Sequence, residues 1–524
     1  MENKEIASVF KLVGQLMDLH GENKFKVRSY SNAAFQLGKL PKPLQSLTSE
    51  ELECIPGIGK NLLPKLKELI STGELGYLNA WLDKTPEGVV EMLRVKGLGP
   101  GKVRTIWQDF GAESIGELLY ACNENRLIDL KGFGEKTQLQ VQESIEFMME
   151  HKNKFLYATI EPLINDIKQW VKNHFPFAKI SETGAALRRD LVLEQLEMVF
   201  TEDVEELPDT TENRIEVVFH KVSHDLFDDE VDRLSLSKEL TERLQVKEKD
   251  VLPDVVRRIV PEMRNVPWAL KWSEDHNSEE LITNNDLRGC LHNHSTFSDG
   301  IHLLEDMALY LKGLGFQYFG ISDHSKTAVY AGGLTEQEII TQHEEINDLN
   351  KRLKPFKVLK GIESDILSDG SLDYSNDVLS SFDFVVASIH SSMKMNEEIA
   401  TKRLIKAIEN PYTSILGHPT GRLLLARPGY PINHRKIIDA CSANHVAIEL
   451  NANPMRLDID YTWIPYCMEK DVFVSINPDA HRIEGFNDMR FGVMAARKGG
   501  LMKENTLNAL SLEGLEHYFR SKSK

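Results

Sequence analysis

The stretch LRGCLHNHSTFSDG, residues 287–300, decides the fold of the C-terminal half of this chain. A short apolar run leads into His292 and His294, and side chains two positions apart on a strand lie on the same face. Five more short runs carry a histidine or a carboxylate near their ends: YFGISDH (318–324), VLKGIES (358–364), FVVASIH (384–390), SILGH (414–418) and VFVSINPDAH (472–481). Strands whose C-terminal ends carry chemical groups are typical of a parallel βα barrel.

Nine candidate metal ligands accompany these runs. A single histidine after a strand is usually structural, but packing does not explain HxH, DxH and further histidines that all stand at strand ends. Mixed nitrogen and oxygen ligands suit Mn²⁺, Zn²⁺ or Fe²⁺ and disfavour a centre made only of Mg²⁺. Several divalent ions held together are typical of hydrolytic sites. The predicted ligands are His292, His294, Asp299, His324, Glu363, His390, His418, Asp479 and His481.

The composition narrows the class of protein. A chain of 524 residues predicts two to four domains. The net charge of −18 argues against membrane binding and against broad, nonspecific affinity for nucleic acid, although backbone amides could still hold nucleic acid locally. The five cysteines form no CxxC pair, and the sequence shows no signal peptide and no apolar run of membrane-spanning length. We therefore expect a cytoplasmic protein.

Residues 1–150 are expected to be entirely helical, with one motif in three copies. The copies are IPGIGKNLLPKLKELI (55–70), VKGLGPGKVRTIW (95–107) and LKGFGEKTQLQVQESI (130–145). In each, a G-x-G turn precedes an amphipathic helix, whose first N–H groups and positive dipole end suit a phosphate. One such turn could be purely structural, but three copies indicate binding to a sugar-phosphate backbone without reading its sequence. The residues predicted to contact DNA are Gly57, Gly59, Lys60, Gly97, Gly99, Lys102, Gly132, Gly134 and Lys136.

The segment NKFKVRSYSNAAFQL, residues 23–37, makes the pattern more specific. Together with the hairpins, with GHPTGRLLLARPGY from Gly417 and with ELNANPMRLD from Glu449, it resembles the bacterial family X DNA polymerases that end in a PHP domain (polymerase and histidinol phosphatase). The resemblance covers nearly the whole chain. It implies a helical DNA-binding region at 1–150, an α+β nucleotidyltransferase palm at 151–265 and a PHP domain at 287–524, folded as a distorted seven-stranded βα barrel. The proline and polar clusters of residues 266–286 indicate a linker before the first barrel strand.

The resemblance also implies how the nine ligands share three divalent ions. One ion is held by His292, His294, Glu363 and Asp479; Glu363 bridges to a second ion, which His390 and His418 complete; and Asp299, His324 and His481 hold the third. Within this set, the residues predicted to be catalytic are Glu363, Asp479 and His390. Four residues that follow strand ends are predicted to bind substrate, with barrel packing as the alternative: Arg422, Asn451, Asn453 and Arg456.

The middle third departs from the family pattern. A family X palm holds two magnesium ions with an Asp-x-Asp pair and a third aspartate. The chain retains the glycine and the two arginines of the segment that precedes the aspartates in this family, as Gly184, Arg188 and Arg189. The three aspartate positions are occupied by Gln195, Glu197 and Glu216. An amide removes a charge, and the longer Glu side chains shift an oxygen by roughly 1.5 Å against a catalytic tolerance of about 0.5 Å. We predict a degenerate palm without nucleotidyl transfer; the alternative is a weak polymerase that uses Glu197 and Glu216.

These features predict a monomeric DNA repair enzyme that hydrolyses phosphodiesters with metal ions on gapped, nicked or 3′-blocked DNA. It would act as a 3′–5′ exonuclease or 3′-end processing enzyme, with AP endonuclease activity as a variant. Two alternatives stay open: a gap-filling polymerase with an associated exonuclease, and a small-molecule phosphatase such as histidinol-phosphate phosphatase, which would not need three phosphate-binding hairpins. Lys65, at the position where some family members carry a lyase nucleophile, follows Pro64 and is predicted to be a solvated lysine.

Overall fold

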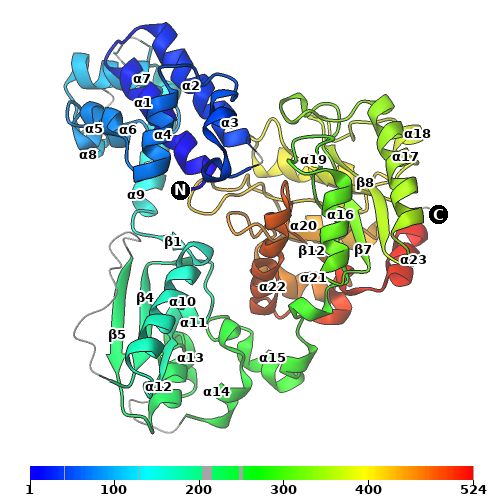
Figure 1. Ribbon diagram of the computed structural model, residues 1–524. Helices are drawn as coiled ribbons and strands as arrows, with labels where there is room; N and C mark the ends of the chain where they lie inside the picture. The colour runs from blue at the N-terminus through cyan, green and yellow to red at the C-terminus, as the bar shows by residue number, and fades with distance from the viewer. Residues whose placement is uncertain are drawn as a thin grey trace. The chain divides into compact units, whose positions relative to one another are not determined.

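The computed structural model describes residues 1–40, 42–124, 126–128, 130, 132–202, 215–246 and 252–522. The chain forms two compact units, Met1–Lys152 and Asn153–Lys524. Within the described residues, the first unit is built from helices, and the second combines small mixed sheets with a larger parallel sheet (Figure 1). In the same residues, no helix has the length and apolar character needed to cross a bilayer.

The N-terminal unit is helical, as predicted. Helix α1 is amphipathic, with Ile6, Phe10 and Met17 fully buried in a cluster that also contains residues of α2 and α4. Leu16 and Leu19 of the same helix join a second cluster, formed by α6 to α9. The elements are α1 (Asn3–Leu19), α2 (Lys24–Lys39), η1 (Leu44–Ser46), α3 (Ser49–Glu53), α4 (Leu63–Thr72), α5 (Gly76–Leu82), α6 (Glu87–Met92), α7 (Pro100–Arg104), the π-helix η2 (Thr105–Phe110), α8 (Ile115–Asn123) and α9 (Glu135–Glu150).

A three-stranded sheet forms the centre of the region that follows. Strand β4 pairs antiparallel with β2 and parallel with β5, in the order β2-β4-β5. Helix α10 covers the sheet, since its Ile160 and Ile167 lie in one cluster with Leu196 and Met198 of β4. This is the α+β arrangement predicted for a palm. The elements are β1 (Phe155–Leu156), α10 (Tyr157–His174), β2 (Ile180–Glu182), α11 (Gly184–Leu187), β3 (Val192–Leu193), β4 (Gln195–Phe200), β5 (Glu216–Lys221), α12 (Phe227–Leu234), α13 (Lys238–Arg243), α14 (Asp254–Arg258) and η4 (Pro261–Met263).

Residues 266–286, predicted to be a linker, are packed. They contain α15 (Ala269–Asp275), η5 (Ser278–Glu280) and η6 (Asn284–Asp286). Trp272 and Leu281 are buried in a cluster with Val256 of α14. The segment is therefore a folded connection rather than a loose tether.

Seven parallel strands form the barrel, in the order β12-β11-β10-β9-β8-β7-β6. Strands such as β7, β9 and β11 are buried along their whole length, which is typical of a parallel sheet covered by helices. Beyond the strand ends the two edges meet, because the His294 N–H donates to the Ala480 carbonyl at 2.9 Å and the Leu291 N–H to Asn477 Oδ1 at 2.9 Å. The barrel is nearly closed, as predicted for a PHP domain.

The barrel elements follow the expected alternation of strand and helix. They are β6 (Gly289–Cys290), α16 (Leu304–Gly313), β7 (Tyr318–Ile321), η7 (Val329–Ala331), α17 (Glu336–Arg352), β8 (Lys357–Asp365), α18 (Asn376–Leu379), β9 (Phe384–Ser388), α19 (Glu397–Ile408), β10 (Ile415–Leu416), α20 (His434–Ala443), β11 (Ala447–Asn451), η8 (Tyr461–Trp463), α21 (Ile464–Glu469), β12 (Val474–Asn477), η9 (Ile483–Asp488), α22 (Met489–Lys498), η10 (Lys503–Asn505), η11 (Leu507–Ala509) and α23 (Leu512–Lys522).

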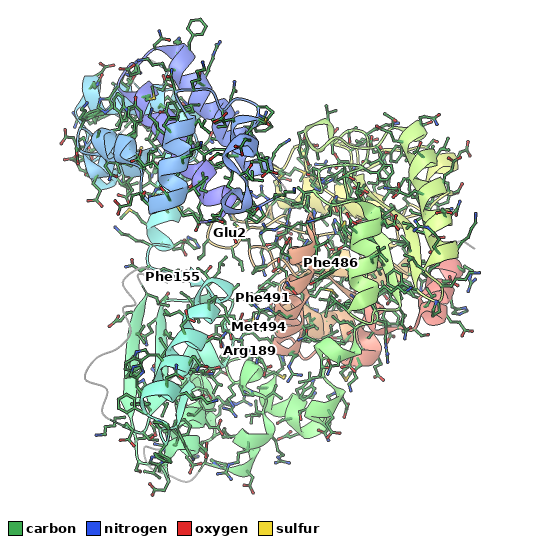
Figure 2. All side chains as sticks on the ribbon, viewed as in Figure 1. Glu2, Phe155, Arg189, Phe486, Phe491 and Met494 are labelled. Atoms are coloured by element: carbon green, nitrogen blue, oxygen red, sulfur yellow. The ribbon has the colours of Figure 1, made fainter. Side chains whose placement is uncertain are left out.

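Helix α22 joins the barrel to the palm-like region. Its Phe491 and Met494, labelled in Figure 2, belong to the same apolar cluster as Ile160 of α10. At the end of the helix, the side chain of Lys498 is 2 % exposed, and its Nζ lies 2.5 Å from Asp190 Oδ1. These contacts explain why residues 153–524 form a single compact unit.

Candidate metal centre and DNA-contacting hairpins

Glu363, near the end of β8, lies at the centre of the predicted ligands. Its side chain is 1 % exposed, and Oε1 lies 3.1 Å from His292 Nε2, 3.2 Å from His390 Nε2 and 3.0 Å from His418 Nε2. The second oxygen, Oε2, faces His324 Nδ1 at 2.9 Å. Imidazoles that follow β6, β7, β9 and β10 therefore converge on one buried carboxylate.

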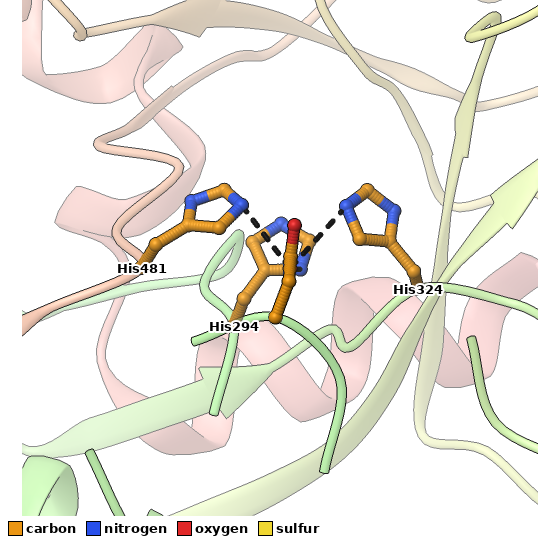
Figure 3. Close-up of side chains that lie close together, drawn as sticks. His294, His324 and His481 are labelled. Atoms are coloured by element: carbon orange, nitrogen blue, oxygen red, sulfur yellow. Dashed lines mark ion pairs between the residues drawn. The ribbon is translucent and has the colours of Figure 1, made fainter. Parts of the chain in front are cut away.

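A second group of candidate ligands lies around Asp299, and Figure 3 labels its three histidines, His294, His324 and His481. Asp299 Oδ1 lies 3.3 Å from His481 Nε2, 3.7 Å from His324 Nε2 and 3.9 Å from His294 Nδ1. One ligand atom from each of these four residues lies within 4.8 Å of all the others, which is close enough to surround one cation. The other groups that meet the same limit are His292 with His294 and Glu363, His292 with His418 and Asp479, and His324 with Glu363 and His390.

The buried atoms of these groups fit divalent metal ions. His292 Nε2, His294 Nε2, His324 Nδ1 and Glu363 Oε2 are buried, and the close approaches among these atoms do not have hydrogen-bond geometry. Buried polar atoms rarely lack a partner. Imidazole nitrogens and carboxylate oxygens gathered in this way are the donor set of zinc, manganese or iron centres.

The electrostatics of the cluster couple its carboxylates to its imidazoles. Against the effect of burial, Glu363 and Asp365 raise the pKa of His390 to about 10, and Asp299 and Asp479 raise the pKa of His481 to about 9. Burial, together with the neighbouring His481 and His324, lowers the pKa of His294 to about 3, so its imidazole is neutral and has a lone pair to donate. Burial opposes a charge on Glu363, but the surrounding histidines, His390 foremost, outweigh burial and hold the pKa of this carboxyl well below its usual range. The centre therefore presents a buried, ionised carboxylate.

Two predicted ligands have left-handed backbone conformations. His418 has a φ of +20° and Asp479 a φ of +53°. Such conformations cost about 1–3 kcal/mol each in non-glycine residues and concentrate at functional sites. At Asp479 the conformation places Oδ1 3.1 Å from His294 Nε2. The turns after β10 and β12 thus store strain where side chains are aimed at the cluster.

Two buried carboxylates that the sequence did not single out orient the imidazoles. Glu449 on β11 contacts His292 Nδ1 at 2.7 Å through one oxygen and accepts the backbone N–H of His418 at 2.7 Å through the other. Asp365 Oδ1 lies 2.5 Å from His390 Nδ1. A partner on one ring nitrogen fixes which nitrogen faces the cluster. Asp365 lies two residues beyond the central glutamate on the same face of β8, and this spacing could have identified it.

The four predicted substrate residues have different surroundings. The guanidinium of Arg422 bonds to a carboxylate and to two backbone carbonyls. Asn451 is buried and donates to Asp479 Oδ2 at 3.1 Å, and Asn453 accepts a backbone N–H of its own loop. Arg456 Nε lies 3.6 Å from Asp479 Oδ2 with the side chain 20 % exposed, so it borders both the cluster and solvent.

The palm positions are brought together on one face of the small sheet. Gln195 begins β4 opposite Glu216 of β5, and Glu197 follows two residues later on the same face. Glu197 Oε1 lies 3.4 Å from His220 Nε2. A Cβ atom on Gly184 would lie 1.9 Å from Glu197 Oε2, so the carboxylate occupies the space beside this glycine.

Both arginines of the retained palm segment contact carboxylates of the protein. Arg188 donates to Asp190 Oδ2 at 2.8 Å and to the Ser235 carbonyl at 3.1 Å. Arg189 NH1 lies 3.7 Å from Glu262 Oε1. The guanidinium of Arg188 is therefore held within the protein, whereas that of Arg189 is half exposed and makes a longer contact.

The three predicted hairpins share one backbone geometry. The first glycine of each turn has a positive φ, +84° at Gly57, +95° at Gly97 and +89° at Gly132. At the second glycine of each turn, an added Cβ would meet nothing within 4 Å: Gly59, Gly99 and Gly134. The first glycine is thus required for the turn, whereas the second leaves the backbone open to a ligand. Lys60 and Lys136 are exposed beside these turns, and Lys102 Nζ donates to the Gly97 carbonyl at 3.2 Å.

Two domain models match the chain. A helix-hairpin-helix domain model matches residues 1–75, and a PHP domain model matches residues 291–453. The chain is also 31 % identical to the DNA polymerase/3′-5′ exonuclease PolX of Bacillus subtilis over 571 aligned residues, which cover 99 % of this chain and 100 % of that protein. The chain therefore belongs to the bacterial family X DNA polymerases that carry a C-terminal PHP domain.

Shorter matches connect the chain to phosphatases. A probable phosphatase of Caldanaerobacter subterraneus is 33 % identical over 105 residues, 19 % of this chain and 39 % of that protein. A probable phosphatase of a Thermoanaerobacter species is 25 % identical over 186 residues, 34 % of this chain and 73 % of that protein.

Proposed function

We propose that this protein is a metal-dependent phosphodiesterase that acts on the 3′ ends of DNA, as a 3′–5′ exonuclease or a 3′-end processing enzyme in DNA repair. The observation that carries the proposal is the buried convergence of imidazoles on Glu363, in a chain that also contains three G-x-G hairpins. The Bacillus subtilis relative is named as a 3′–5′ exonuclease. Gapped, nicked, abasic or 3′-blocked DNA is the proposed class of substrate, bound by a monomer.

In this proposal the nine ligands hold three divalent ions of Mn²⁺, Zn²⁺ or Fe²⁺, with Glu363 shared between two of them. Such ions supply Lewis acidity at the phosphoryl oxygens of a bound diester. Asp365 and Glu449 keep the imidazoles of His390 and His292 oriented, so that these ligands need no rearrangement when the ions bind. The burial of His292, Glu363 and His418 strengthens the charge interactions among them, whereas Asp299 and His481 are partly exposed.

Arg456 is the proposed phosphate-binding residue. Of the four substrate candidates, it combines a position beside Asp479 with a partly exposed guanidinium. Arg422 uses its donors within the protein, and Asn451 orients Asp479. We assign these two residues to the support of the site.

We further propose that the palm has lost nucleotidyl transfer. Gln195 supplies no charge, Glu197 lies close to His220, and Arg188 is bound to Asp190. The competing function is weak gap filling with Glu197 and Glu216 as metal ligands, which the family membership favours because the Bacillus subtilis relative is named as a DNA polymerase.

A small-molecule phosphatase is the other competitor, supported by the short matches to probable phosphatases. A primer gel and a parallel chromogenic assay distinguish the nuclease, the polymerase and the phosphatase. The protein is incubated in Mn²⁺ with a labelled primer on a gapped duplex, with and without dNTPs, and in parallel with p-nitrophenyl phosphate. Shortening of the primer supports the proposal, extension supports the polymerase, and release of nitrophenol with an unchanged primer supports the phosphatase.

A further inference from the structure

Val329 and Tyr330 form an exposed apolar tip beside the metal centre. They begin η7, in the loop between β7 and α17, and are 81 % and 71 % exposed. The centroid of the Tyr330 ring lies 6.2 Å from that of His324, one of the predicted ligands. Two adjacent large side chains exposed beside a buried polar cluster offer an apolar contact surface to a ligand of that cluster.

The loop that carries the tip is firmly held. The Ala328 carbonyl accepts the N–H groups of Ala331 at 2.9 Å and Gly333 at 3.1 Å, and the Leu334 N–H donates to the His324 carbonyl at 2.8 Å. Ala328 and Leu334 are fully buried. The tip is therefore fixed to the same strand end that carries His324, although its own side chains face solvent.

The same loop is tied to a second part of the cluster. The Thr327 hydroxyl donates to Asp365 Oδ2 at 3.0 Å, and the other oxygen of Asp365 lies 2.5 Å from His390 Nδ1. Tyr330 also lies close enough to Arg456 to interact with it electrostatically. The aromatic ring thus lies at the rim of the centre. Its loop is bonded to the strand ends that carry His324 and Asp365.

We propose that Tyr330, supported by Val329, is a stacking platform for the nucleobase attached to the phosphodiester that the metal centre hydrolyses; this inference rests on the proposed function. A nucleotide whose phosphate lay among the ligands around His324 would carry its base one sugar away, and the Tyr330 ring, 6.2 Å from the His324 ring, is close enough to meet that base. Stacking on an aromatic ring tolerates every base, because every base has a π-face. An abasic sugar offers nothing to stack, so the platform makes the enzyme favour 3′ ends that carry a base.

The test uses the full-length protein and three variants. Tyr330→Ala removes the ring, Tyr330→Phe keeps the ring and removes the hydroxyl, and Ile340→Ala removes another apolar side chain, 52 % exposed on α17, as the matched control. Each protein is assayed on two labelled oligonucleotides that differ only in the 3′-terminal unit, a normal nucleotide or an abasic sugar. Bound metal is measured by mass spectrometry.

We expect Tyr330→Ala to lower kcat/KM on the base-bearing end by roughly 10-fold or more, mostly through KM, and to leave the abasic end within about two-fold of the wild type. Tyr330→Phe and Ile340→Ala should match the wild type on both ends, with unchanged metal content. Equal losses on both ends, or a loss of metal, would show that Tyr330 supports the centre and would overturn the platform. An unchanged Tyr330→Ala enzyme would also overturn it. A wild type that shortens neither oligonucleotide yet hydrolyses p-nitrophenyl phosphate would refute the proposed function itself.

Discussion

Replacing Glu363 by glutamine should disable two metal positions at once. The substitution keeps the shape of the side chain but turns one oxygen into an NH₂ group, a donor that faces other donors or a cation. In the structure, Oε1 stands within 3.0–3.2 Å of three imidazole nitrogens and Oε2 within 2.9 Å of a fourth. Both oxygens are therefore in use, and either orientation of the amide removes an essential one.

The size of the effect follows from this arrangement. Loss of a residue that only orients a ligand costs about 10- to 100-fold in metal affinity. Loss of a ligand that would contact two ions should lower the affinity for each ion by at least the upper end of this range. That is roughly 100-fold, or about 3 kcal/mol, per ion. If the proposed hydrolysis uses both ions, the rate at limiting metal should fall by at least about 1,000-fold, which allows for coupling between the two positions.

The assay compares Glu363→Gln with Glu449→Gln and with Glu344→Gln, an exposed carboxylate on α17 that serves as the control for loss of charge. Metal content after dialysis is measured by mass spectrometry beside the rate of 3′-end removal. We expect the largest loss of metal and of rate in Glu363→Gln, a smaller loss in Glu449→Gln, and no loss in Glu344→Gln. The affinity for DNA should be equal in all of them. A Glu363→Gln protein that has lost metal yet degrades DNA at the wild-type rate would place the active site elsewhere and refute the reasoning.

Three further outcomes are expected. Gly59→Ala and Gly99→Ala should leave the fold intact, because an added Cβ meets nothing within 4 Å, and should weaken DNA binding by roughly 10-fold on unrelated sequences in fluorescence anisotropy; unchanged affinity would make the hairpins structural. The Gln195→Ala, Glu197→Ala double variant should retain every DNA activity of the wild type; template-directed dNTP addition that this variant loses would contradict the degenerate palm. Burial raises the pKa of Glu262, but Arg497, a backbone hydrogen bond and Arg189 together lower it by more, so the pKa of the folded state lies below the ordinary value of 4.5. The contribution of this carboxylate to the free energy of unfolding is therefore present above pH 4.5 and is lost as the pH falls through the lowered pKa. In chemical denaturation, Glu262→Gln should be less stable by about 3 kcal/mol at pH 7, with a gap that narrows in acid.

The barrel was predictable because its evidence is local. Each strand is a short apolar run, and the candidate ligand stands at or just beyond its end. Because these ends lie together at one end of the barrel, the position of a residue in the sequence predicts its position in the site. The same applies to the hairpins, where Gly57 and Gly97 are needed for a positive φ wherever the rest of the chain lies. These features need no knowledge of which distant segments come together.

Other parts of the site depend on contacts that the sequence does not display. Glu449 orients His292 across 157 residues, and no histidine stands beside it in ELNANP to mark its role. Lys498 contacts Asp190 across 308 residues. Residues 266–286 have the polar and proline-containing composition of a linker. Trp272 and Leu281 are nevertheless buried in an apolar cluster, because they contact residues such as Val256 that the local composition does not reveal.

The contact between the palm-like region and the barrel supports the proposal that the palm has lost nucleotidyl transfer, independently of the missing aspartates. Arg188 donates to Asp190, and the other oxygen of Asp190 lies 2.5 Å from the buried ammonium of Lys498 on the barrel helix. Removal of either partner of such a pair leaves the other charge buried and uncompensated, which costs about 3–5 kcal/mol. A triphosphate that recruited Arg188 would have to break into this network. Aspartates placed at positions 195 and 197 would therefore supply metal ligands but not a free arginine, and nucleotide binding would still compete with the packing of the barrel.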